Sequence, residues 1–182
     1  MVKPTMISAL FCISLSLQAV YASPSNQTVE SAQKFLAITL PEKDFLPGSL
    51  QAQFKQIARS NGDSSRVYEY GKILDASPIN RCVSKWSYST DGLKVRIDHK
   101  NRFLVKPLNV LKPDLKTVTN DNGIDWGEVL SVRQDKQIVE ILFSSKEETS
   151  KINLASDDLA TRVAFAIKYL QHHCDKASET GF

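Results

Sequence analysis

The cluster His172-His173-Cys174-Asp175 has the residue types of a metal site. Neighbouring residues on a helix point about 100° apart, so these two histidines cannot converge on one ion as an i, i+4 pair does. Cys174 could add a ligand only if it were unpaired. We therefore predict no metal here and interpret the histidines as cations that favour the C-terminal end of a helix dipole.

A second cluster, Asp121-Asn122-Gly123-Ile124-Asp125, has the composition of a calcium-binding loop. With Gly123 aligned to the central glycine of such a loop, Val118 and Val129 fall at its first and last ligand positions. Valine side chains cannot bind a cation, so the sequence predicts a turn at residues 120–123 instead.

Motifs of catalysis are missing from the sequence, which contains no G-x-S-x-G, no H-E-x-x-H and no glycine-rich phosphate loop. His99 is the only histidine outside the C-terminal pair, and it follows a predicted strand. We predict no catalytic, cofactor or metal residues and a protein that is not an enzyme. A hydrolase using His99 or His172 remains the least favoured hypothesis.

The start of the chain has the pattern of a secretory signal peptide. Lys3 precedes the apolar stretch 6–20, and Val20 and Ala22 occupy the −3 and −1 positions of a cleavage site before Ser23. The apolar stretch is short for a membrane span. We expect residues 1–22 to be removed and the protein to be exported, periplasmic or secreted, without a stable membrane span; an N-terminal membrane anchor is the alternative.

Two cysteines, Cys82 and Cys174, remain after this cleavage. In an exported chain they most simply pair with each other, closing a loop of roughly 90 residues. Two free buried thiols are the alternative.

Charge and aromatic residues give few binding candidates. The net charge of +3 falls by one when Lys3 is removed, which is too small to indicate a nucleic-acid partner. Lys94, Arg96 and Arg102 belong to a basic stretch that could form a solvated strand face or a partner-binding surface. Trp126 follows a predicted loop, where an exposed ring could anchor a partner.

The clearest helix of the chain is predicted from Ser156 to Asp175. Ser156 is a good N-cap, and Asp157 and Asp158 place negative charge at the positive end of the helix dipole. An apolar stripe recurs every three or four residues along it, formed by Leu159, Val163, Ala166, Ile167, Leu170 and Cys174. Phe165 and Tyr169 widen this apolar face, which needs a sheet to pack against.

Two shorter helices are predicted before the strands, in an N-terminal helical segment over residues 23–65. The first runs from Thr28 to Leu40, where Pro41 stops it, and the second from Ser49 to Asn61-Gly62. The stretch 42–48 between them is predicted as a connector. The two helices are expected to form a hairpin over one end or edge of the sheet.

Alternation of apolar and polar residues begins at Arg66 and predicts short strands with an Asp91-Gly92 hairpin turn. The predicted strands are 67–74, 80–89, 93–98, 102–106, 115–119, 128–133, 137–143 and 151–155. Residues 66–182 thus predict an α+β fold: a bent antiparallel sheet or partly open barrel of about seven strands, packed by the long C-terminal helix. Together with the helical segment this makes one domain.

This order of elements, with Ile124-Asp125-Trp126 leading into a strand pair and the closing helix, resembles the pleckstrin-homology-like architecture. The resemblance covers residues 66–175 and implies a strand meander closed by a C-terminal helix. No residue-specific family signature accompanies it, and cystatin-like or lipocalin-like sheets remain alternatives.

The sequence therefore favours an exported, non-enzymatic binding protein that recognises another protein, as inhibitor or immunity-like modules do. The alternative is a carrier of a lipid or other small apolar ligand between sheet and helix. That alternative predicts a cavity among Trp86, Tyr88, Val139, Ile141 and Phe165.

Overall fold

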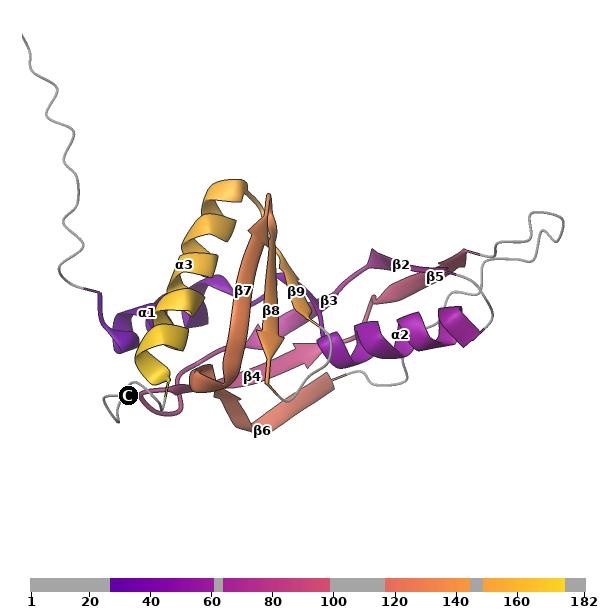
Figure 1. The fold of residues 1–182 in the computed structure, drawn as a ribbon. Coiled ribbons are helices and arrows are strands. Elements are labelled where there is room, and N and C mark those ends of the chain that lie inside the picture. Colours follow the sequence, from indigo (N-terminus) through magenta and orange to yellow (C-terminus); the bar gives the residue numbers. More distant parts are fainter. Residues whose placement is uncertain (1–26, 61–63, 99–116, 145–148, 176–182) are drawn as a thin grey trace, which may run out of the picture.

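The computed structural model describes residues 27–60, 64–98, 117–144 and 149–175, and the predicted α+β class is confirmed (Figure 1). The helices are α1 Val29–Thr39, α2 Gly48–Ser60, the short 3-10 helix η1 Trp126–Glu128 and α3 Asp157–Cys174. The strands are β1 Asp44–Leu46, β2 Ser64–Glu69, β3 Gly71–Asp75, β4 Val83–Ser89, β5 Lys94–Asp98, β6 Thr117–Asp125, β7 Val129–Asp135, β8 Ile138–Phe143 and β9 Ser150–Asn153. No helix of these ranges is long and apolar enough to cross a membrane.

Strands β6, β4, β3, β1, β9, β8 and β7 form one seven-stranded sheet in that spatial order, and every pairing in it is antiparallel. Figure 1 shows β7, β8 and β9 crossing the direction of β3, β4 and β6 steeply, so the sheet is strongly bent. Among the described strands, β6 and β7 are its open edges, and the sheet does not close into a barrel.

The closing helix α3 forms where its sequence predicts. The Ser156 hydroxyl oxygen accepts a hydrogen bond from the Leu159 N–H at 3.2 Å, which satisfies one free donor of the first turn. Val163, Ile167 and Leu170 are all 0% exposed and pack with β7, β8 and η1. Burial of side chains of this size contributes about 1.5 to 3 kcal/mol each, so packing on the sheet, rather than helix propensity, holds α3 in place.

The two N-terminal helices do not form the expected hairpin. α1 begins with a capping box between Thr28 and Ser31 and packs against α3. α2 lies at the other end of the molecule, over the two-stranded sheet of β2 and β5 (Figure 1). The expected connector between them contains β1, which pairs with β3 on one side and β9 on the other. The predicted helical segment therefore contributes a central strand to the main sheet.

The expected hairpin at Asp91-Gly92 is wrong in its pairing. The turn exists, since the Leu93 N–H donates to the Thr90 carbonyl at 3.0 Å and Gly92 has a φ of 84°. However, β4 before the turn pairs with β3 and β6, whereas β5 after it pairs with β2. The predicted strand 67–74 is likewise divided at Tyr70 into β2 and β3. The break at Tyr70 and the turn at Asp91-Gly92 lie side by side. As a result, β2 and β5 form one sheet, and β3 and β4 belong to the other.

The predicted loop at residues 120–123 is instead part of β6, where the register shifts opposite β4. Gly123 adopts a φ of 73°, and a Cβ added there would lie 2.6 Å from the Ser84 carbonyl oxygen. A glycine is needed at this bulge because its backbone lies so close to β4. The predicted strand 102–106 lies outside the described residues, as do the first two positions of the predicted strand 115–119.

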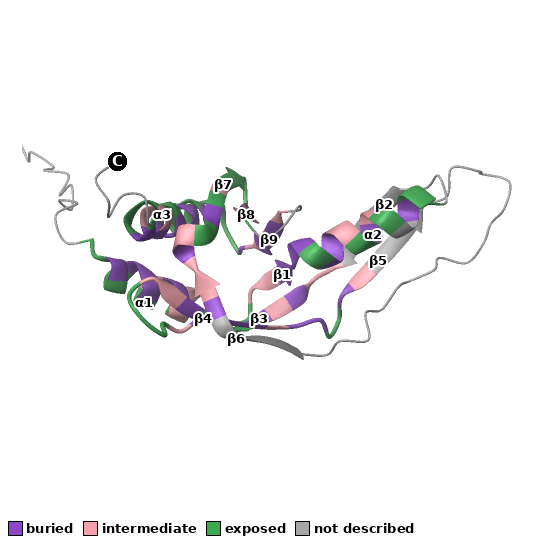
Figure 2. Cartoon of the chain, turned by 60° about the horizontal axis from the view of Figure 1, so that its bottom comes forward, coloured by how far each residue is buried: buried purple, intermediate pink, exposed green. Residues whose placement is uncertain are grey.

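Two separate apolar clusters stabilise the molecule, and Figure 2 shows their buried residues at both ends. The larger cluster joins α1, α3, η1 and the bent sheet, with Leu36, Ile73, Trp126 and Ile141 all 0% exposed. The smaller cluster holds α2 through Leu46, Leu50, Phe54, Ala58 and Leu93.

One carboxylate of the sheet gives a pH-dependent contribution to stability. Partial burial raises the pKa of Asp75, but hydrogen bonds from Ser77 and the nearby Lys85 ammonium outweigh it and lower this pKa below its ordinary value of 3.8. Because the folded-state pKa is the lower one, the contribution is present above about pH 4 and is lost as the pH falls through the folded-state value. We expect Asp75→Asn to lower the free energy of unfolding by up to about 1 kcal/mol at pH 6. Urea unfolding at several pH values should show this difference shrinking below pH 4; a difference that does not change with pH would contradict it.

Candidate binding groove between the first and last helices

An open groove of about 330 Å³ runs between α1 and α3 on the surface of the molecule. Its lining residues are Gln27, Ser31, Ala32, Phe35, Thr161, Arg162, Phe165, Ala166 and Tyr169. Three aromatic rings form the sides, and two alanines keep the helix surfaces thin. The volume lies at the lower end of the range for ligand pockets in proteins.

The two helices present these side chains by their periodicity. Ser31 and Ala32 lie four and three residues before Phe35 on α1, and Arg162, Phe165 and Tyr169 share a face of α3. The Tyr169 hydroxyl donates a hydrogen bond to the Gln27 carbonyl at 2.6 Å, at the N-terminal end of α1. The Arg162 guanidinium lies over the Phe35 ring, 5.2 Å from its centre, near the other end. The helices therefore run antiparallel along the groove.

Apolar side chains remain exposed here although α3 has a large buried face. Phe165 is 51% exposed at the groove, and Ile38, one turn beyond Phe35 on α1, is 73% exposed. A half-exposed phenylalanine beside other aromatic rings leaves apolar surface in contact with water in the free protein. Covering that surface with a partner would lower the free energy.

The charged residue that lines the groove among the described residues is Arg162, and Lys34 and Lys168 are exposed elsewhere on the same two helices. Lys34 on α1 and Arg162 and Lys168 on α3 form no ion pair with the carboxylates that the structure describes. The acidic residues stand at the helix starts, where Asp157 and Asp158 face the positive end of the α3 dipole. Glu30 is in the first turn of α1, and a backbone hydrogen bond, the Thr28 side chain and Arg81 lower its pKa.

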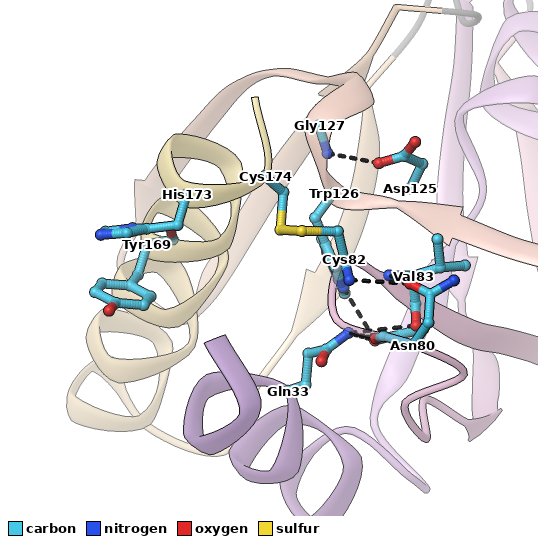
Figure 3. Close-up of a disulfide and its surroundings, with 11 residues drawn as sticks. Gln33, Asn80, Cys82, Val83, Asp125, Trp126, Gly127, Tyr169, His173 and Cys174 are labelled. Atoms are coloured by element: carbon cyan, nitrogen blue, oxygen red, sulfur yellow. Dashed lines mark hydrogen bonds between the residues drawn. A yellow bond between two sulfur atoms is a disulfide. The ribbon is translucent and has the colours of Figure 1, made fainter. Parts of the chain in front are cut away.

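A disulfide between Cys82 and Cys174 fixes the C-terminal end of α3 to the start of β4, as the sequence predicts (Figure 3). Their Cα atoms are 5.5 Å apart, and 92 positions separate them in the sequence. Gly127 of η1 approaches so closely that an added Cβ would lie 2.3 Å from the Cys174 carbonyl oxygen. The bridge and this close contact together set the position of α3.

A buried polar network fixes α1 to the same place. The Gln33 side-chain amide, 1% exposed, donates to the Asn80 carbonyl at 2.9 Å and lies 3.3 Å from the Ser84 hydroxyl. The Trp126 indole N–H donates to the same Ser84 oxygen at 3.0 Å. Both helices that form the groove are therefore held by β4 and its preceding loop, so the groove is built on rigid elements.

The C-terminal histidines lie on the exposed side of α3. The His173 ring stacks on Tyr169 with 3.9 Å between ring centres (Figure 3). His172 lies edge-on to His173. Cys174 is in the disulfide and is no ligand. The described residues hold no group of three or more side chains suited to a metal ion.

The expected exposure of Trp126 is wrong. Its side chain is 0% exposed because η1 turns the ring into the core, edge-on to Trp86 at 6.2 Å. A ring in that position offers no contact surface to a partner.

The predicted basic residues are not brought together by the described structure. Lys94 forms an ion pair with Glu69 at 2.7 Å. Arg96 is described only by its backbone in β5, and Arg102 and His99 lie outside the described residues. Their role in binding stays a prediction.

The cavity expected between sheet and helix is not formed by the residues proposed for it. Trp86, Val139 and Ile141 are at most 3% exposed and belong to the main apolar cluster. Phe165 points away from the sheet into the groove. The sequence does hold a signal for the groove, because Phe165 lies off the buried stripe while sharing the spacing of Arg162 and Tyr169.

Comparison with known proteins adds little to this geometry. No family model matches the chain, and no curated protein does. A solved structure described as the PH domain from PfAPH aligns over 83% of this chain and 98% of its own, at 11% identity and a TM-score of 0.37. The predicted resemblance to the pleckstrin-homology-like architecture rests instead on the order of the elements, a bent antiparallel sheet followed by a C-terminal helix, without a family signature. A TM-score this low carries no argument about function.

Proposed function

We propose that this protein is an exported, non-enzymatic binding protein that recognises another protein through the α1–α3 groove. The observation that carries the proposal is the half-exposed Phe165 beside Phe35, Tyr169 and an Arg162 that forms no ion pair with a described carboxylate. Aromatic residues and arginine are enriched where proteins bind one another, and they supply most of the binding energy there. A module of this kind would act by capture, as inhibitors and immunity proteins do.

Export is supported by the signal-peptide pattern of residues 1–22 and by the disulfide. Bridges such as Cys82–Cys174 persist in oxidising compartments and are rare in the cytosol. The protein would then act in the periplasm or outside the cell.

A carrier of small apolar ligands is less well supported. The space between α3 and the sheet is occupied by residues with almost no exposure, such as Val139 and Ile167. The groove is open, so a lipid lying in it would keep one side in water, whereas ligand pockets bury most of their ligand.

A capture experiment tests the proposed function. The mature protein from Ser23 is immobilised and incubated with extracts of its own source, and retained proteins and small molecules are identified by mass spectrometry. We expect one stoichiometric protein partner, retained by wild type and lost with Phe165→Ala. Leu130→Ala is the matched control, because Leu130 is an exposed apolar residue, 59% exposed, on β7. Retention of a lipid alone, or of no protein, would refute the proposal.

A further inference from the structure

We infer that the α1–α3 groove takes an amphipathic helix of the partner protein, with a carboxylate placed against Arg162. This rests on the proposed function and adds the chemistry of the partner segment. It is argued from the walls of the groove, its length and its charge.

The walls favour a helix over an extended peptide. Both walls of the groove are α-helices, whose backbone N–H and C=O groups along the groove are already paired within each helix. An extended segment would bring its own backbone groups against apolar rings with no partners, which is costly. A helix satisfies its own backbone and can set one row of side chains between Phe35 and Phe165.

The floor of the groove allows such close packing. Ala32 and Ala166 line it with the smallest side chains that retain a Cβ, while the aromatic rings stand at its sides. The lining on α3 extends from Thr161 to Tyr169, and with a rise of about 1.5 Å per residue this stretch spans about 12 Å. The bound segment should therefore bury about two helical turns, with apolar residues three and four positions apart.

The charge of the partner follows from the cations beside the groove. Among the described residues that line it, Arg162 alone is charged, and the Phe35 ring orients the guanidinium through its π face. A guanidinium without an ion pair can bind a carboxylate through two parallel hydrogen bonds. Lys34 and Lys168, exposed on the same two helices, add positive charge. An acidic residue at the edge of the apolar stripe complements the Arg162 guanidinium, and a basic residue there would be repelled.

A selection experiment tests this inference without knowledge of the partner. A display library of 14-residue helical peptides, with a fixed apolar stripe and randomised flanking positions, is panned against the full mature protein. We expect wild type and Leu130→Ala to select Asp or Glu beside the stripe, and Arg162→Glu to select Lys or Arg instead. The best acidic peptide should bind Arg162→Gln about fivefold more weakly than wild type, measured by fluorescence anisotropy.

The site of binding is checked by amide chemical shifts, which should change at Ser31, Phe35, Phe165 and Tyr169. Circular dichroism and thermal unfolding should be the same for the exposed Arg162 and Phe165 variants and for wild type. Selection of no peptide, or of peptides without a charge preference, would overturn the inference. The inference would also be overturned if oleate changed the chemical shifts of the same amides and the peptides did not.

Failure of the inference is distinguishable from failure of the proposed function. A captured partner that Phe165→Ala releases and Arg162→Glu retains refutes the acidic helix but leaves the protein-binding groove in place. Absence of any captured protein refutes the proposed function itself.

Discussion

Replacing Cys82 and Cys174 together with alanine is expected to lower the free energy of unfolding by about 4 kcal/mol in the chain-entropy model of a long closed loop. The bridge joins residues 92 positions apart, so its removal greatly increases the freedom of the unfolded chain. Urea unfolding followed by tryptophan fluorescence measures the loss. A domain of this size has a stability of about 5 to 15 kcal/mol, so the variant would be close to unfolding.

Reduction of the wild-type protein provides the control. It leaves both sulfur atoms in place but breaks the bond, and it should therefore lower stability by a similar amount. A loss below about 1 kcal/mol in both experiments would mean that the contacts of Gly127 and of the α3 stripe hold the helix without the bridge.

Trp126→Ala is expected to lower the free energy of unfolding by about 3 to 5 kcal/mol, the usual cost of truncating a large buried ring. The ring is 0% exposed at the point where η1, β4 and α3 meet. Its loss leaves a cavity and also leaves the Ser84 hydroxyl without the indole donor. Unfolding in urea, compared with Leu130→Ala at less than about 0.5 kcal/mol, measures the effect.

A double-mutant cycle separates the hydrogen bond from the packing. Trp126→Phe removes the N–H and keeps most of the ring, and Ser84→Ala removes the acceptor. The two changes should couple by about 1 kcal/mol, the usual net value of one hydrogen bond. A cost for Trp126→Ala as small as that of the Leu130 control would show that the ring is not part of the core.

The elements fixed by local chemistry could be predicted from the sequence. α3 and α1 have their caps and stripes within a few residues, and the structure places them within one residue of the expected ends. The β7–β8 hairpin was predictable for the same reason, because its strands are joined by the short turn around Lys136. The disulfide followed from the simplest pairing of two cysteines.

Long-range pairing could not be predicted in the same way. β1 has three residues, too few to show a period, and it is a strand only because β3 and β9 lie on either side. The Asp91-Gly92 turn has the local chemistry of a hairpin, but β2 and β3 take the two strands into different sheets. In both cases the strand that pairs with the segment decides the structure of that segment, and the pairing strand is distant in the sequence.

The groove was missed because it belongs to two helices more than a hundred positions apart. Phe35 looks like a core residue of its own helix and Phe165 only widens the apolar face of α3, so neither position shows by itself that the two helices form a groove. They meet because Gln33 and Cys174 attach both helices to the region around β4. The burial of Trp126 was unpredictable for a related reason, since the polar segment before it pairs with β4 as β6 and the chain then turns inward as a 3-10 helix.

Because β1 lies in the middle of the sheet, its pairings with β3 and with β9 must form at different times during synthesis. Asp44 pairs with Lys72 on one side and with Asn153 on the other. A chain that leaves the ribosome from its N-terminus can complete the first pairing early, but the second edge of β1 stays open until residues 150–153 have emerged. Contacts this distant in sequence slow folding, and an open strand edge invites pairing with other chains. The nascent protein therefore keeps an unpaired strand edge in the middle of its sheet until residues 150–153 have been made.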